Sequence, residues 1–265
     1  MNLKEKQMLE ILKLGKEKFY FAGIKAEFEA EGTRSDEMHR LVELTRKSGL
    51  NLGIKIGGCE AVSDLYKTKL LGAEYIIAPM VETAYSLKKY IDAKNKVYST
   101  EERKDVRFLF NLETITAFNN LDSIIDVAVA KEGADGIVFG RVDFVGSMGF
   151  GREKISNGEI VPYINKASEL CKKNNLDFVI GGAISNETID SVIEANKIYL
   201  SRFETRKIIF DAKAFTMNDS NLNKALELAV KFELLWLQNK QNYYTAIANE
   251  DSSRISMLSK RFEKF

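Results

Sequence analysis

Residues 51–81, NLGIKIGGCEAVSDLYKTKLLGAEYIIAPMV, decide the fold class of this chain. Two short apolar runs, NLGIKIGG at 51–58 and AEYIIAPMV at 73–81, flank a stretch of helical period and predict two strands around a helix. A strand, a helix and a strand in this order are typical of a parallel βαβ unit. The same alternation extends over about residues 20 to 213.

Seven strands are predicted along this region. Five lie outside the first unit, at residues 22–31, 106–114, 136–144, 177–185 and 197–210. The length and the even composition favour a closed (β/α)8 TIM barrel, an α/β fold, over an open doubly wound sheet. An eighth strand is not evident, so the first strand of the barrel is expected to be irregular or missing. Its position is filled either by a short strand KFYF at 18–21 or by the N-terminal helix.

Helical segments complete the predicted organisation. Ser35 is expected to cap a helix that stops at Gly49, and Ser185 to cap a later one. We predict a barrel with its N-terminal helix over residues 1–213 and a helical extension over 214–265. The extension reads as two helices, 221–247 and 251–265. The first carries one apolar stripe that suits the barrel and a second subunit equally well, formed by Leu222, Leu226, Ala229, Phe232, Leu235 and Trp236.

Composition and charge exclude several classes of protein. Lys and Arg number 39 against 38 Asp and Glu, so nothing in the overall charge attracts nucleic acid or an anionic membrane. No apolar run approaches the ~20 residues of a membrane span. Two cysteines without metal-ligand spacing predict a reducing, cytoplasmic setting and no disulfide framework. With His39 as the single histidine, any metal must rest mainly on oxygen ligands.

Several predicted strands alternate charged and apolar residues, although helices cover the outside of such a barrel. If the apolar residues face the helices, the charged ones converge in a polar barrel interior, where each needs a partner or a metal. A self-neutralising ion-pair network without a catalytic role is the competing interpretation. The inward set is Lys25, Glu27, Glu29, Lys55, Asn111, Glu113, Arg141, Asp143, Arg202, Glu204 and Arg206.

Three acids, Glu82, Glu113 and Asp143, lie at the carboxyl ends of strands, where barrel active sites are found. Glu113 and Asp143 end consecutive strands and are expected to share one Mg²⁺ or Mn²⁺ ion. His39 is expected at the surface, and Cys59 has no histidine to activate it, which favours a structural role.

Two glycine-containing segments follow strands at the same end of the barrel. The turn after Asp143, with Gly146, Ser147 and Gly149, offers backbone amides for a carboxylate, although a plain loop is the simpler alternative. Gly181 and Gly182 lie where barrels often bind phosphate, a pattern that is also ordinary strand-to-helix chemistry.

In four motifs the sequence resembles the aldolase/citrate lyase family (HpcH/HpaI type) of the phosphoenolpyruvate/pyruvate barrel superfamily, over about residues 22–212. The motifs are IKAEFEAEGTRSDEM, GIKIGGCEAVSDLYKTKLLGAEYIIAPMVET, FNLETITAFNN and GIVFGRVDFVGSMG, in that order. The resemblance implies a (β/α)8 barrel, homo-oligomers, and Mg²⁺ or Mn²⁺ chemistry on a carbon–carbon bond next to pyruvate or an acyl group. It assigns the metal to Glu113 and Asp143, the 2-oxo acid carboxylate to the Gly146–Gly149 turn, and the enolate oxygen to Lys55, where many members carry arginine.

One departure from the family concerns proton transfer. The aldolase branch has an acid–histidine pair after the first strand, whereas this chain reads Glu29-Ala30. We expect a divalent-metal lyase or aldolase acting on a small 2-oxo acid, with Lys55 or Arg141 stabilising the enolate and with Glu29, Glu82 or a metal-bound water moving protons. Hydrolysis or phosphoenolpyruvate-type chemistry in a sugar or polysaccharide pathway is the second hypothesis, and a non-catalytic barrel subunit is the third.

Overall fold

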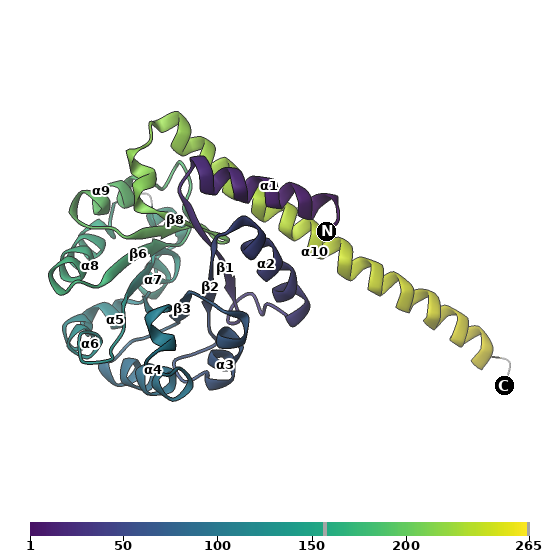
Figure 1. The fold of residues 1–265 in the computed structure, drawn as a ribbon, viewed down its shortest axis with the longest axis horizontal. Coiled ribbons are helices and arrows are strands. Elements are labelled where there is room, and N and C mark those ends of the chain that lie inside the picture. The colour runs from purple at the N-terminus through teal and green to yellow at the C-terminus, as the bar shows by residue number, and fades with distance from the viewer. Residues whose placement is uncertain (156–157, 264–265) are drawn as a thin grey trace.

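The barrel is closed and has eight strands, which are hydrogen-bonded in chain order. The structure is a computed structural model that describes residues 1–155 and 158–263 (Figure 1). This structure confirms the predicted α/β barrel, and a helix follows the barrel at the C-terminus. The strands are β1 (Phe21–Glu27), β2 (Asn51–Lys55), β3 (Tyr75–Ala78), β4 (Arg107–Leu112), β5 (Gly136–Gly140), β6 (Asp177–Gly181), β7 (Arg202–Glu204) and β8 (Ile208–Asp211).

Helices surround the barrel and connect most of its strands (Figure 1). Short 3₁₀ turns occupy Glu102–Lys104, Arg152–Ile155 and Ala212–Thr216. The α-helices are α1 (Leu3–Lys18), α2 (Ser35–Ser48), α3 (Val62–Leu71), α4 (Ala84–Val97), α5 (Ile115–Asn119), α6 (Leu121–Ala128), α7 (Arg141–Ser147), α8 (Val161–Asn174), α9 (Asp190–Ile198) and α10 (Asp219–Phe262).

The eighth strand comes from an unexpected place. The run at 197–210, predicted as one strand, contains β7 and β8, which pair antiparallel with each other, and β8 also pairs antiparallel with β1. Thr205 closes the turn, because its hydroxyl accepts a hydrogen bond of 3.1 Å from the Ile208 amide. The candidate at 18–21 was wrong, since β1 begins at Phe21 and the residues before it end α1.

The predicted helix starts were less accurate than the helices themselves. Gly49 ends α2 in the left-handed conformation, with φ of 68°, as expected. Ser35, however, is the first residue of α2, and Arg34 occupies the N-cap position. Ser185 does not cap α9, which begins only at Asp190; its amide instead donates to the Thr188 hydroxyl within a turn.

Inside the barrel, an apolar layer separates the polar cavity from the opposite end. Ile77, Leu109, Val138 and Val179, from β3 to β6, form a buried cluster of their own. Polar residues of the same strand faces lie toward the carboxyl ends of the strands, so the polar interior that the alternation predicts is confirmed. The larger hydrophobic core fills the space between strands and helices.

The C-terminal extension is one helix rather than two. α10 runs for 44 residues, packs beside α1 along its first part, and projects away from the barrel beyond it (Figure 1). Leu222, Phe232 and Trp236 of its predicted stripe are buried, which confirms packing within the chain. Contact with a second subunit stays a prediction. In the described part of the chain, no helix is both long and apolar enough to cross a membrane.

Candidate active site

A cavity of about 520 Å³ opens at the carboxyl ends of the strands. Ile77 and Val138 of the apolar layer line it, and ten of its lining residues are charged. Six carboxylates and four cationic side chains surround the space, which leaves an excess of negative charge. These groups are Glu27, Glu29, Glu113, Asp143, Glu204 and Glu233, with Lys25, Lys55, Arg152 and Arg206.

Lys55, at the end of β2, connects two of these carboxylates. Its Nζ lies 2.9 Å from Glu29 Oε2 and 3.3 Å from Glu113 Oε2. Burial acts to lower the pKa of Lys55, but Glu113 and Glu29 outweigh it and raise that pKa, so the ammonium group stays charged. The second oxygen of Glu113 accepts a 2.9 Å hydrogen bond from the Met80 amide.

Asn111 completes this group, which we call the Lys55 cluster: Lys55, Glu29, Glu113 and Asn111. The Asn111 amide nitrogen donates to Glu113 Oε2, while its Oδ1 is buried without a hydrogen-bond partner among the described residues. A buried polar atom without a partner is costly and uncommon in proteins. The cluster therefore holds an oxygen that is available to a ligand.

Lys25, on β1, forms a second group with Glu27 and Glu204, the Lys25 cluster. Its Nζ lies 2.6 Å from Glu204 Oε1 and 3.3 Å from Glu27 Oε1. Burial opposes the charge on Lys25, yet Glu204 and Glu27 together raise its pKa far above the ordinary value. Every side chain of this cluster has an ion-pair partner.

Two glycines make room for these clusters. A Cβ atom at Gly140 would lie 2.9 Å from Glu113 Oε2, and one at Gly181 would lie 3.1 Å from Glu204 Oε1. Both glycines end neighbouring strands, and the side chains of Glu113 and Glu204 pack over them. Gly182, which follows, has φ of +87°, a conformation that other residues adopt only with strain.

Some predicted site residues lie outside the cavity. Arg141 begins α7 instead of continuing β5, so its side chain leaves the inward face; it is fully buried and donates to the carbonyls of Gly182 and Thr188. Burial lowers the pKa of Arg141 to about 10. Its expected place in the barrel interior was therefore wrong, and it holds the Gly182 loop instead.

Glu82 and the glycine-containing turn also lie elsewhere. Glu82 accepts a 2.7 Å hydrogen bond from the Thr114 hydroxyl and does not line the cavity. Gly146 and Ser147 are part of α7, and they and Gly149 are absent from the cavity wall. Their expected role in carboxylate binding has no support from their position. Gly181 and Gly182 do line the cavity.

Two charged cavity residues, Arg152 and Glu233, were not predicted from the sequence. Arg152 lies beyond the glycine turn, in a stretch with no strand or helix pattern. Glu233 had a detectable signal, because it is acidic and lies one turn from Ala229, inside the apolar stripe of α10.

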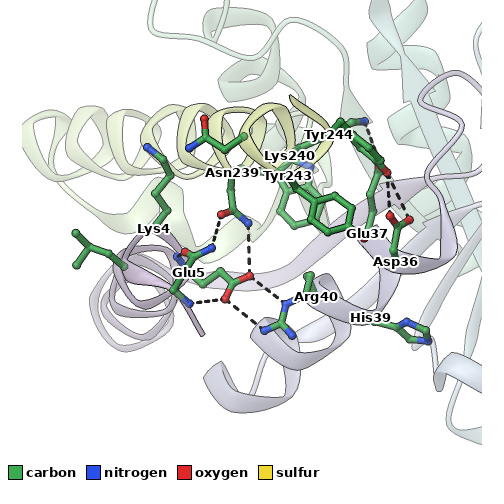
Figure 2. A pocket seen from close by; sticks show the side chains of 14 residues that line it. Lys4, Glu5, Asp36, Glu37, His39, Arg40, Asn239, Lys240, Tyr243 and Tyr244 are labelled. Carbon is green, nitrogen blue, oxygen red and sulfur yellow. Dashed lines mark hydrogen bonds and ion pairs between the residues drawn. The ribbon is translucent and has the colours of Figure 1, made fainter. Parts of the chain in front are cut away.

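A larger groove of about 750 Å³ lies outside the barrel, between α1, α2 and α10 (Figure 2). Its polar side chains satisfy one another: Arg40 binds Glu5 at 3.1 Å, and the Tyr244 hydroxyl donates to Glu37 at 2.9 Å (Figure 2). His39 lies at its edge and is exposed, as expected. The Arg40 contact joins α2 to α1 and the Tyr244 contact joins α10 to α2, so these groups hold the helices together, and we assign the chemistry to the barrel cavity.

Comparison with known proteins agrees with the barrel. The family model described as HpcH/HpaI aldolase/citrate lyase matches residues 59–194. An HpcH/HpaI aldolase from Desulfitobacterium hafniense DCB-2 is similar, with a TM-score of 0.57 and 14% identity over 78% of this chain and 84% of that one. No curated protein matches this chain.

Two further solved structures share the fold. A protein of the HpcH/HpaI aldolase/citrate lyase family from Burkholderia cenocepacia J2315 has a TM-score of 0.60 and 11% identity over 94% of this chain and 92% of that one. A variant of the citrate synthase SbnG has a TM-score of 0.55 and 14% identity over 75% and 81% of the two chains.

Proposed function

Because this chain belongs to the HpcH/HpaI aldolase/citrate lyase family, we propose that it is a carbon–carbon lyase whose substrate is a small 2-oxo acid. The reaction would pass through an enolate, formed when the bond next to the keto group breaks. The observation that carries the proposal is the charged Lys55 in the cavity, held between Glu29 and Glu113. A fixed positive charge at this place suits an oxygen that becomes negative during the reaction.

The residues also fit a divalent cation, Mg²⁺ or Mn²⁺. Glu113, Asp143 and the unpartnered Asn111 Oδ1 are hard oxygen donors that line one cavity. Among the described residues, no three His, Cys, Asp or Glu side chains form a metal site by themselves, so an amide oxygen and substrate oxygens would complete the coordination. The excess of carboxylates supports this proposal, because an anionic substrate enters an acidic cavity only if a cation offsets the charge.

Glu113, Asp143 and Asn111 would hold the cation, which would supply Lewis-acid chemistry by drawing electrons from the keto group of the 2-oxo acid. The remaining work falls to the chain itself. Lys55 faces the developing enolate charge, and Glu29 holds the ammonium group in place. Arg141 fixes the Gly182 loop through its carbonyl and so keeps the wall of the cavity beside β5 and β6 rigid. A rigid wall of this kind limits the orientations of a bound substrate.

Metal binding gives the direct test. We expect Glu113→Gln and Asp143→Asn each to abolish or strongly weaken Mn²⁺ binding in calorimetric titration, while circular dichroism shows an unchanged fold. Glu60→Gln is the matched control, since Glu60 is far more exposed, pairs with Lys89 and is not among the residues that line the cavity. Undiminished Mn²⁺ affinity in both site variants would show that Glu113 and Asp143 do not bind the metal.

Enolate formation is tested separately, by deuterium exchange into the methyl group of pyruvate in the presence of Mn²⁺. Wild-type protein should catalyse this exchange without any second substrate. If it does not, pyruvate enolisation is not its chemistry, and hydrolysis, phosphoenolpyruvate-type chemistry or a non-catalytic barrel takes its place.

A further inference from the structure

We propose that Glu233 of α10 is the acid–base residue of this cavity, which moves a proton to and from the substrate carbon. The inference rests on the proposed function and goes beyond it, since no residue on α10 belongs to the predicted site. It answers a specific question, because the sequence carries Glu29-Ala30 where an acid–histidine pair would supply proton transfer.

Most of the carboxylates that line the cavity are paired with lysines. Of its six carboxylates, four are held by lysines: Glu27 and Glu204 by Lys25, and Glu29 and Glu113 by Lys55. A carboxylate fixed on an ammonium group is a poor base, because the ion pair stabilises its ionised form.

Two carboxylates remain. In the described part of the chain, Asp143 and Glu233 have neither an ion-pair nor a hydrogen-bond partner, and both line the cavity. Asp143 is exposed and has the role of metal ligand in the proposed site. Glu233 is therefore the one lining carboxylate left for proton transfer.

The position of Glu233 suits this role. It is partly buried on the face of α10 that turns toward the barrel, and Val230, one turn earlier, lines the cavity with it. The charged groups that face it are Arg206 and Lys207 of the β7–β8 turn, Glu31 after β1, and Lys25 of β1.

Three of these neighbours form ion pairs with each other. Arg206 binds Glu31 at 3.0 Å, and Lys207 binds the other oxygen of the same carboxylate. Burial is the main influence on Glu233 and raises its pKa, outweighing Lys207 and Arg206. A carboxyl group with a raised pKa gains and loses a proton closer to neutral pH, as a general acid–base must.

The proton balance is simple. In enolisation, the Glu233 carboxylate takes a proton from the methyl group of pyruvate, and the electron pair of that C–H bond becomes the C=C bond of the enolate. In the lyase direction, the enolate carbon takes a proton from the Glu233 carboxylic acid, which returns to the carboxylate and regains a proton from solvent.

The experiment compares pyruvate deuteration by wild type and Glu233→Gln in ²H₂O with Mn²⁺, followed by proton NMR. We expect exchange in the variant to fall about 100-fold or more, the usual contribution of a general base. Mn²⁺ affinity should be unchanged, which a collapsed site would not allow. Glu233→Asp should retain part of the activity. Glu227→Gln is the control, because Glu227 is exposed on the same helix and pairs with the exposed Lys224.

The pH profile adds a readout that a structural role would not change. Wild-type exchange should decline as the pH falls through the raised pKa of Glu233, because the carboxylate is the active form, and Glu233→Gln should lack this decline. Exchange in Glu233→Gln within twofold of wild type would overturn the inference alone. Loss of exchange in Glu29→Gln but not in Glu233→Gln would assign the base to Glu29. No exchange in wild type would overturn the proposed function and the inference together.

Discussion

Lys25 and Lys55 enter the same cavity from neighbouring strands, and each binds two carboxylates at the barrel's carboxyl end. The Lys25 cluster is complete, since all its charged groups have partners. The Lys55 cluster contains Asn111 Oδ1, a buried oxygen with no partner among the described residues. A satisfied buried cluster fits a structural role, whereas an unsatisfied one has capacity for a ligand.

The largest expected effect comes from breaking the complete cluster. Lys25→Met leaves Glu27 and Glu204 buried without their shared partner, so the free energy of unfolding should fall by about 3–5 kcal/mol. Urea denaturation followed by circular dichroism measures it. Lys197→Met, which removes an exposed ion pair with Glu194, should cost under about 1 kcal/mol. An equally small effect of Lys25→Met would contradict the structural role of its cluster.

Lys55→Met should mainly slow the reaction, whereas Lys25→Met mainly destabilises the fold. Pyruvate exchange should slow by about 100-fold or more, because a donor facing the enolate is lost. Mn²⁺ should bind at least as tightly as before, since a positive charge 3.3 Å from Glu113 is removed. Exchange at the wild-type rate would make Lys55 a structural member, like Lys25, and would end the distinction between the clusters.

Two alanine substitutions offer a finer comparison. A Cβ at Gly140 would lie 2.8 Å from Glu113 Cβ, whereas one at Gly181 would meet Glu204 at 3.1 Å. Gly140→Ala should therefore displace Glu113 and weaken Mn²⁺ binding by about 10- to 100-fold, the effect of a disturbed ligand support. Gly181→Ala should leave Mn²⁺ affinity nearly unchanged. Titration calorimetry on both variants decides, and equal losses would count against Glu113 as a ligand.

The smallest effect concerns acid stability. Burial acts to raise the pKa of Glu27, but Lys25, Lys55 and Arg206 outweigh it and lower that pKa. The stabilisation is present above the unfolded pKa of about 4.3 and is lost as the pH falls through the lower folded value. Urea midpoints between about pH 5 and pH 3 should thus fall less steeply in Glu27→Gln than in wild type. If the urea midpoints of the two proteins changed equally with pH, the ionised Glu27 carboxylate would not be stabilised by its neighbours.

The sequence predicts the parallel part of the barrel well, because the alternation of charged and apolar residues along a strand indicates which of them face inward. Lys55 and Glu113 were placed in the cavity on this basis. The antiparallel β8 could not be found in this way, since residues 197–210 form one continuous β-rich run and the Thr205 turn contains neither glycine nor proline. Arg141 was misplaced for a related reason, because the strand predicted at 136–144 continues through Gly140, where β5 ends and α7 begins.

Contacts between distant segments explain the other differences. α10 was divided at residues 248–250, although the helix continues through them to Phe262. Glu233 reaches the cavity only because α10 passes beside the β7–β8 turn, where Lys207 lies over the Trp236 ring. The residues around position 233 do not predict this contact between distant segments. Ion pairs such as Lys25–Glu204 join residues that are far apart in the chain. The alternation of charged and apolar residues therefore predicts a polar interior, but it does not show which charged groups pair.

The antiparallel β8 also changes how the barrel can assemble. Only Thr205, Arg206 and Lys207 separate β8 from β7, so these two strands form a local hairpin, a unit that closes in about 1–10 μs in small peptides. A parallel last strand would instead need a crossover of a dozen or more residues. Closing the ring requires the pairing of Phe21 with Phe210 across most of the chain, which joins β1 to an edge of two strands that are local to each other in sequence.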